Sequence, residues 1–540
     1  MRGDFSAWNK DRSQNFRGTL HQQGRVLLDR DWNAQTEVIG EWQETAGRDA
    51  FGAGVAAIPA EVPNSFKVTQ AAKVGSEVKV YLKSGATTTE KKGRVWADGL
   101  LAELAADISI PFPPAGLPPV PAAGADVIRT ATYLNPPPGT VGELPGNKHD
   151  AVILETWLQE LSPFQVPDLL IEPALGGVDT TERVQTAYRF RLYRMTDTET
   201  CDSIIPKLKD DFSLKGKLTA KLNDMTETGG DCPVVESGGY TGFEHRLYRI
   251  EIADTDPTKK VGSYFKWSQF NGGLVGRGVF DTGASKVDIR ANQNAIAHCG
   301  INTFYLEALE FDTALGCWQV IYGVSNVTLN ADNTLTLPAA SNEFTGNVPP
   351  KTSGGKEKLH FFRLWNGIER VNDFTAAAGT DLPDKVGIKL KFDAEAAGRY
   401  TASDFWTFEA RVGQGIDATT PPLVDNKPPH GIFYHRVPLA ELDWKTNSLV
   451  NGDDIEDCRR PFQPLTKLKT CCTYRVGDGV NSHGDFTKIQ DAIDALPKKG
   501  GEVCILPGFY EENIVLKAPH NRNVILKGCG RRTVIKAKEY

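Results

Sequence analysis

The stretch that decides the fold is GDFTKIQDAIDALPKKGGEVCILPGFYEENIVL, residues 484–516. The apolar positions of its first half follow one face of a short helix: Ile489, Ala492, Ile493 and Leu496. Thr487 and Gln490, three positions apart, form a capping-box pattern at the start of this helix, and Pro497 ends it. The sequence therefore predicts a short amphipathic helix that leads into apolar strands.

Short apolar segments at even spacing predict a coil of strands. The predicted strands are 503–506, 514–516, 524–526 and 533–535. Alternate residues of a strand share a face, so the expected inward stack is Val503, Ile505, Ile514, Leu516, Val524, Leu526 and Ile535. Several stacked turns are needed to bury such a core. We therefore expect the native chain to run on, or neighbouring chains to complete the coil.

Four short sequence motifs in this region resemble the beginning of a known fold: GDFT (484–487), QDAI (490–493), LPGFYEE (506–512) and LKGCG (526–530). They resemble the first turns of the right-handed parallel β-helix of the pectin-lyase-like superfamily. The resemblance implies that the helix caps the first rung and protects its unpaired backbone groups. In pectinesterase-like relatives the acids that act on the polymer lie further along the coil. The resemblance therefore carries over no catalytic residue.

Composition and charge limit the classes of function. The chain has 540 residues, 40% hydrophobic and 24% charged residues, and a net charge of −7, which argues against a nucleic-acid or anionic-membrane partner. The first residues have no apolar signal core, and no run reaches membrane-spanning length. We therefore expect synthesis in a reducing cytoplasm, with the nine cysteines as free thiols.

Composition shifts along the chain predict a mainly β, multidomain protein whose small β domains precede the start of the β-helix. The expected division is 1–50 (arm and helix), 51–145 (small β domain with proline-rich linker), 146–425 (β-rich body), 426–473 (connector) and 474–540 (capping helix and first β-helix turns). The body contains strands that alternate arginine with aromatic residues, at 186–195 and 243–252. Such strands can bind a sugar or nucleic acid, but the acidic chain and the strand period favour one polar and one buried face.

The N-terminal region reads as an extended arm followed by a helix. Asp29 or Asp31 can cap a helix that runs to about Gly47. Its stripe consists of Trp32, Gln35, Ile39, Trp42 and Ala46. This stripe packs either on the domain behind it or on another subunit. An arm with few apolar anchors is ordered most easily by a partner, so we predict attachment through Phe5, Trp8, Phe16 and Trp32. The alternative is that the arm folds back on its own body.

Candidate chemical sites are few. Phosphate-binding, dinucleotide-binding, nucleophile-elbow and zinc-helix motifs are missing. Cys471 and Cys472, with Cys458 upstream, suggest a metal or redox site, although adjacent cysteines rarely serve one tetrahedral metal and buried thiols are common. His483 and Asp485 fit turn and capping roles better than catalysis. We therefore predict no catalytic residue, no metal and no cofactor.

Several further segments resemble one uncharacterised family: MRGDFS (1–6), QGRVLLDRDWN (23–33), ALGGVDTT (174–181), RLYRIEI (246–252), FKWS (265–268) and the cysteine pair before the β-helix. Such proteins are similar to those encoded beside baseplate and tail genes of phage-tail-like contractile injection systems.

The resemblance implies a non-enzymatic spike, fibre or cage-like subunit, made in a bacterial cytoplasm and incorporated into a particle that is released or membrane-anchored. Its expected partners are other baseplate or tail subunits and copies of itself, as a trimer or hexamer, without nucleic acid or direct membrane insertion. The alternatives are a β-helix lyase or esterase acting on polysaccharide, and a glycan- or receptor-binding module.

Overall fold

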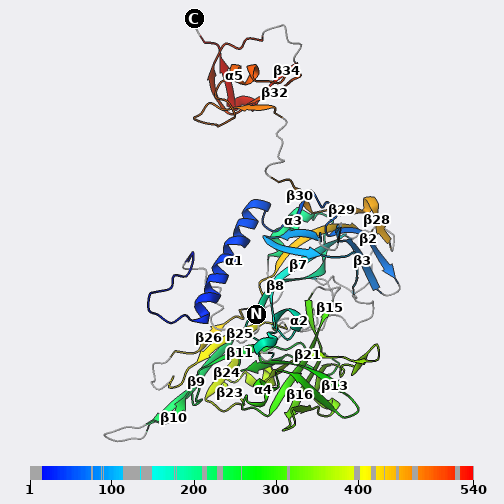
Figure 1. Ribbon diagram of the computed structural model, residues 1–540, viewed down its shortest axis with the longest axis vertical. Coiled ribbons are helices and arrows are strands. Elements are labelled where there is room, and N and C mark those ends of the chain that lie inside the picture. Colours follow the sequence, from blue (N-terminus) through cyan, green and yellow to red (C-terminus); the bar gives the residue numbers. More distant parts are fainter. Residues whose placement is uncertain are drawn as a thin grey trace. The chain divides into compact units, whose positions relative to one another are not determined.

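The computed structural model describes residues 15–74, 77–86, 88, 91–112, 134, 149–175, 177, 179–209, 216–227, 235–256, 258–312, 317–394, 400, 402–414, 421–430, 432–444, 449–464, 472–516 and 523–538. The predicted anchors Phe5 and Trp8, Cys471 and most of the proline-rich segment after residue 112 lie outside these ranges. The chain forms two units, Met1–Phe462 (unit 1) and Gln463–Tyr540 (unit 2). The described part is mainly β, as the sequence predicts (Figure 1).

Three sheets of unit 1 share one hydrophobic core, which is built from both ends of the unit. The first contains β1 (Ala56–Pro59), β4 (Gly93–Ala97), β5 (Leu100–Leu104) and β30 (Arg460–Phe462). The second contains β2 (Lys67–Val74), β3 (Glu77–Lys83), β6 (Ile108–Phe112) and β28 (Leu449–Asn451). The third contains β7 (His149–Leu161), β8 (Arg183–Met195), β27 (His435–Asp443) and β29 (Ile455–Asp457). The expected connector 426–473 thus supplies strands that complete these sheets, because their apolar faces bury the same core.

Two further cores fill the rest of unit 1. One lies between the sheets of β9 (Leu218–Glu227), β10 (Val235–Gly239), β23 (Thr380–Asp381), β24 (Ile388–Phe392) and β26 (Val424–Lys427), and of β11 (Arg246–Ile252), β12 (Tyr264–Ser268), β22 (Gly367–Arg370) and β25 (Phe405–Ala410). The other belongs to a seven-stranded sheet of β13 (Leu274–Asp281), β14 (Lys286–Ala291), β15 (Thr303–Asp312), β16 (Cys317–Leu329), β17 (Thr334–Thr336), β18 (Glu343–Gly346) and β21 (His360–Trp365). Strands β19 (Thr352–Ser353) and β20 (Lys356–Glu357) form a separate hairpin.

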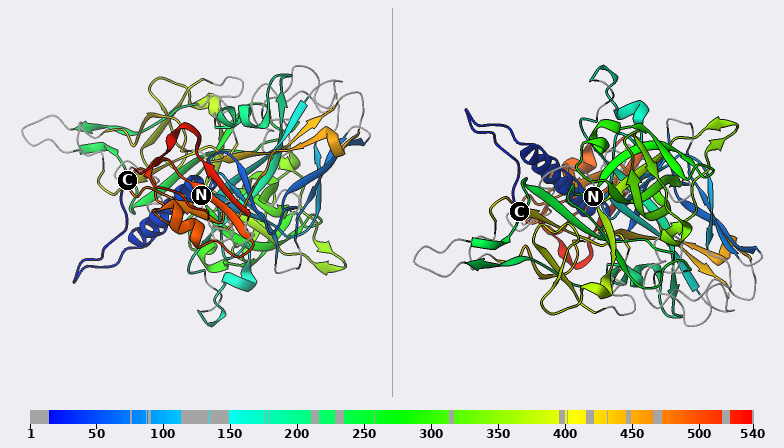
Figure 2. Two further views of the ribbon diagram at one scale, coloured as in Figure 1. Left: turned by 90° about the horizontal axis from the view of Figure 1, so that it is seen from above. Right: turned by 90° about the horizontal axis from the view of Figure 1, so that it is seen from below.

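Helices are few and mostly short. Those of unit 1 are α1 (Asp29–Phe51), α2 (Pro167–Leu170), α3 (Cys201–Leu208) and α4 (Gln293–Ala297). The 3-10 turns are η1 (Pro173–Leu175), η2 (Ala340–Asn342), η3 (Val371–Phe374), η4 (Gly452–Asp454) and, in unit 2, η6 (Gly530–Arg532). Helix α1 is the long one, with 23 residues, and it projects with the chain before it in both views of Figure 2.

The arginine- and aromatic-rich strands differ from expectation, because both faces of β11 and of the second half of β8 are buried. The predicted polar face is wrong here. A buried guanidinium is tolerated only when it is paired. Arg249 Nε lies 2.7 Å from a carboxylate oxygen of Glu251, and Arg194 Nε lies 2.5 Å from one of Asp150. Four arginines of these strands, Arg189, Arg191, Arg194 and Arg249, are therefore buried inside the protein, and Arg246 is partly exposed.

Four cysteines are paired, so the expectation of free thiols is wrong for them. Cys201, at the start of α3, is bonded to Cys458, and Cys472 is bonded to Cys504. The first pair joins residues 257 positions apart, with Cα atoms 5.9 Å from each other. Such a pairing depends on how the sheets bring the two segments together, and cysteine spacing alone gives no sign of it.

The described part of unit 2 contains parallel strands and the helix α5. Its elements are β31 (Tyr474–Val476), α5 (Ile489–Asp494), β32 (Gly500–Ile505), β33 (Gly508–Glu511), β34 (Asn523–Gly528) and β35 (Thr533–Lys536). Strands β31, β32 and β34 form one parallel sheet, and β33 pairs in parallel with β35. The predicted helix and three of the four predicted strands are present. Residues 514–516 form no strand, and β33 forms instead.

Three of the seven residues of the predicted inward stack are exposed to solvent. Val503 and Ile505 are buried against α5, and Ile514 and Val524 are half-buried on the same core. Leu526 lies opposite Val503 in the parallel register, and Ile535 opposite Tyr510, yet Leu526 is 38% exposed and Ile535 and Leu516 are also exposed. The register is therefore as predicted for Leu526, but its burial is not.

The start of α5 is capped from a distant part of the chain. The predicted capping box of Thr487 and Gln490 is wrong, because the N-cap residue is Lys488 and it makes no side-chain cap. The backbone N–H groups of Ile489 and Gln490 instead donate to the carboxylate of Glu512, at 2.9 and 3.1 Å. A carboxylate at this end also complements the helix dipole. The Gln490 side chain is left free to bind the backbone of residue 515.

Replacing Glu512 by alanine is expected to destabilise unit 2 by about 1–2 kcal/mol, because two N–H groups lose a charged acceptor. Hydrogen exchange of the α5 amides would measure this loss. The matched control is Glu511→Ala, because Glu511 makes only an exposed ion pair with Lys536. Equal exchange rates in the two variants would contradict the capping role.

Candidate functional site

Helix α1 turns its apolar residues to solvent, which is the reverse of an ordinary surface helix. Trp32 is 73% exposed, Trp42 62% and Ile39 46%. The buried residues of α1 are Glu44 and Gly47. The interpretation that the stripe packs on the domain behind it is therefore wrong for Trp32, whereas Ile39 and Trp42 border a groove beside that domain without being buried in it. The helix presents an apolar surface, which we call the outer face: Trp32, Ile39 and Trp42.

The C-terminal end of α1 is fixed to the turn between β4 and β5. Gly47 and Gly99 make close backbone contact, and a Cβ atom on Gly47 would lie 2.9 Å from the Gly99 carbonyl oxygen. Arg48 Nε donates to the carbonyl of Asp98 at 3.2 Å, and the Phe51 ring lies 4.4 Å from that of Phe462. These contacts fix the orientation of the helix. The exposure of its outer face is therefore not caused by unfolding of the helix end.

The described part of the arm folds back toward α1 without covering the outer face. The backbone N–H of Thr19 donates to Gln35 Oε1 at 2.7 Å. Most side chains between residues 15 and 28 are exposed, including Phe16, Val26 and Leu27. The structure thus places two predicted anchors, Phe16 and Trp32, at the surface. A partner could reach both.

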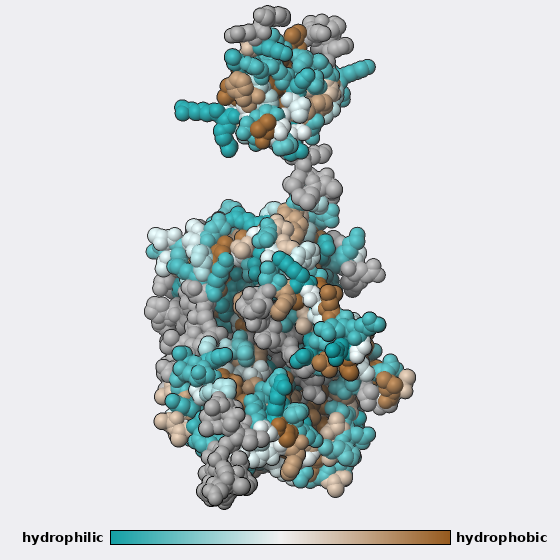
Figure 3. All heavy atoms as spheres, turned by 90° about the vertical axis from the view of Figure 1, so that its left-hand side faces the viewer, coloured by the Kyte–Doolittle hydropathy of each residue, from teal (hydrophilic) through white to brown (hydrophobic). Residues whose placement is uncertain are grey.

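A mainly apolar groove of about 780 Å³ lies beside α1, between the helix and strands β5, β7 and β8. Its lining includes Ile39, Trp42, Phe51, Trp96, Leu101 and Val184. Figure 3 faces the side of unit 1 on which α1 lies in Figure 1, and brown apolar side chains alternate there with teal polar ones. Exposed apolar surface that is rimmed by polar residues is typical of a protein-binding site.

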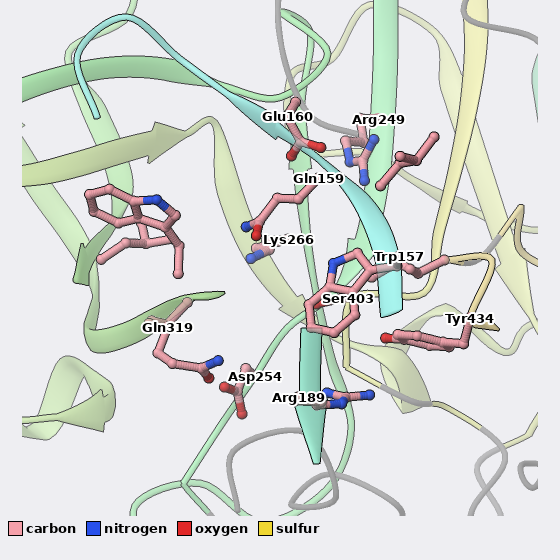
Figure 4. A pocket seen from close by; sticks show the side chains of 15 residues that line it. Trp157, Gln159, Glu160, Arg189, Arg249, Asp254, Lys266, Gln319, Ser403 and Tyr434 are labelled. Carbon is pink, nitrogen blue, oxygen red and sulfur yellow. The ribbon is translucent and has the colours of Figure 1, made fainter. Parts of the chain in front are cut away.

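The second candidate is a polar cavity inside unit 1 (Figure 4). Labelled side chains reach it from several strands and loops, among them Trp157, Arg189, Arg249, Lys266 and Tyr434. Its volume is about 70 Å³. A water needs roughly 10–15 Å³ of such space, whereas ligand pockets run to several hundred, so the cavity suits a few waters and not a sugar ring.

The cations beside this cavity have carboxylate partners. Lys266 Nζ lies 2.6 Å from Glu307 and 3.3 Å from Glu251, and Arg249 pairs with Glu251. The indole N–H of Trp365 donates to Glu307 at 2.9 Å. These groups neutralise one another, and a network satisfied in this way specifies a core rather than supplying a free acid or base.

Glu155 on β7 lies at the centre of a buried charged cluster. It accepts from Arg189 Nε and Arg436 Nε, both at 2.6 Å, and Arg191 is close enough to act on its charge. Burial alone would raise the pKa of Glu155, but the three guanidinium groups lower it to about 2. Burial and the neighbouring Arg189 lower the pKa of Arg191 to about 9. Sequence reasoning missed this cluster, because the carboxylate lies on β7 and its arginine partners lie on two other strands, β8 and β27.

The remaining predicted sites are structural. The carboxylate of Asp485 accepts from the backbone N–H of Arg475 at 2.8 Å, in keeping with a turn role. Among described residues, Cys472, Glu502 and Cys504 form a group whose geometry could hold a metal. The two sulfur atoms are bonded to each other, however, so neither is available as a thiolate ligand.

Comparison with known proteins gives one match, to a family of unknown function (DUF6519) over residues 1–214. The match covers less than half of the chain, from the arm through α3, and ends before β9. It contains α1 and its anchoring turn, but not the strands β27 to β30 that complete the same sheets. No curated protein and no solved structure matches the chain.

None of the described helices is both long and apolar enough to cross a bilayer.

Proposed function

We propose that this chain is a non-catalytic structural subunit of a multi-subunit particle, and that α1 with the arm before it is its attachment element. The observation that carries the proposal is the outer face of α1. An apolar helix face that a fixed anchor holds in contact with water is energetically unfavourable. Covering this face with a partner lowers the free energy. Aromatic residues at the centre of such a contact carry much of its binding energy.

The type of particle comes from the sequence resemblance. Residues 1–6, 23–33, 174–181, 246–252 and 265–268 are similar to those of proteins encoded beside contractile injection baseplates. In this setting the chain serves as a baseplate-associated spike, fibre or cage-like subunit. The parallel strands of unit 2, with α5 beside them, support the finer proposal that unit 2 begins a right-handed β-helix. The small polar cavity gives little support to the polysaccharide enzyme or glycan-binding alternatives.

Deletion of residues 2–28 tests the attachment role. We expect the truncated chain to fold, because the described part of the arm contributes little to the cores of unit 1. We expect it to be lost from purified particles, as judged by copurification. Full-length chain with Phe243→Glu is the control, because Phe243 is 98% exposed and far from α1 in sequence. Normal occupancy of the truncated chain would move the attachment role to the β domains.

A further inference from the structure

The outer face of α1 has the spacing of a coiled-coil seam. Its positions in the helix follow one another at intervals of three, four, three and four residues: Trp32, Gln35, Ile39, Trp42 and Ala46. A repeat of this kind keeps one narrow stripe in line along a helix, and such stripes pair with one another by interlocking side chains. We call these five residues the seam. The spacing indicates that its occupant is another helix.

Charge distribution identifies the kind of helix that fits. Between residues 32 and 48 the charged residues of α1 all lie off the seam, at Glu37, Glu41, Glu44 and Arg48. Glu44 is buried on the body side, and Arg48 contacts Asp98 there. The positions that flank the seam between residues 32 and 48 are uncharged: Thr36, Val38, Gln43 and Thr45. Acidic residues, Asp29 and Asp31, lie beside the seam only at the first turn of the helix. Two identical seams can therefore meet with like charges confined to that turn.

We propose that α1 pairs with α1 of a second copy of this chain. The inference rests on the proposed structural role and names the partner of its attachment surface. The arm contacts the seam at Gln35, where pairing would displace it, and both tryptophans stay exposed on either side of that residue. The groove beside Trp42 offers space for side chains of the second copy. A polar residue at one seam position, here Gln35, lowers affinity but fixes register.

The test measures the mass of the purified full-length chain in solution by light scattering over a concentration series. We expect the wild type to associate and Ile39→Glu to weaken association by a factor of about ten or more, because the change introduces like charges at the centre of the seam. Phe243→Glu is the matched control and should associate as the wild type does. Ile39 is partly exposed, so the variant should keep its fold, which circular dichroism checks.

Gln35→Leu moves association in the other direction. An apolar residue at that seam position is expected to tighten pairing, even though the hydrogen bond to Thr19 is lost. A wild type that stays monomeric at all concentrations overturns the self-pairing, as does association that Ile39→Glu leaves intact. If Ile39→Glu leaves a monomeric chain unchanged in mass but removes it from particles, the occupant is another subunit. In that case the proposed function stands and the self-pairing falls.

Discussion

Replacing Glu155 by glutamine is expected to lower the free energy of unfolding of unit 1 by about 3–5 kcal/mol, since it leaves buried arginines without their carboxylate. Glutamine keeps the size of the side chain, so the loss reports charge and not a cavity. Urea unfolding followed by tryptophan fluorescence measures it. All ten tryptophans lie before residue 463, so this signal belongs to unit 1.

The same carboxylate predicts how acid affects unit 1. The pKa of Glu155 falls from 4.5 to about 2 on folding, which corresponds to roughly 3 kcal/mol. Because the folded-state pKa is the lower one, this stabilisation is present above pH 4.5 and is lost as the pH falls toward 2. The difference between wild type and Glu155→Gln should therefore shrink over that range. A difference that stays constant down to pH 2 would contradict the assignment.

Glu103→Gln is the control for charge removal. Glu103 pairs with Lys92 at 3.3 Å on the surface, and each side chain is about half exposed. Exposed pairs contribute up to about 1 kcal/mol. A loss at Glu155 no larger than the loss at Glu103 would mean that water reaches the cluster and that it is not a buried charge network.

The difference between these two pairs shows what the sequence could predict. Strand periodicity around residues 186–195 correctly indicated β8, because alternation follows from backbone geometry alone. It could not show that the arginines are buried, because Arg189 pairs with Glu155 on β7. The same carboxylate also pairs with Arg436 on β27. Pairing of this kind depends on strand order, which local pattern does not determine.

The helices lead to the same conclusion. The spacing around Ile489 indicated α5, but Glu512, more than twenty residues away, supplies its cap. The stripe of α1 was visible in the sequence, yet its direction was not, because either face of a helix can be the buried one. The close approach of Gly47 to Gly99 turns the charged side of α1 inward. A small residue in the charged face was the available signal for that direction.

Replacing Val503 by aspartate is expected to unfold unit 2 and leave unit 1 folded. Val503 is fully buried between α5 and the parallel strands, where a carboxylate would lose its hydration without gaining a cation. The cost, several kcal/mol, is comparable to the whole stability of a small unit. Hydrogen exchange of β32 and β34 should rise to the rate of unfolded chain, while the tryptophan fluorescence of unit 1 stays unchanged.

Two matched variants test the register. Val534→Asp makes the same change at an exposed position of β35 and should cost little. Leu526→Asp is the discriminating case, because Leu526 lies opposite Val503 in the parallel register but is partly exposed. A carboxylate there keeps part of its hydration, so its effect should fall between the other two. Equal effects at Val503 and Val534 would mean that β32 does not turn Val503 inward, and the parallel stack in this register would have to be abandoned.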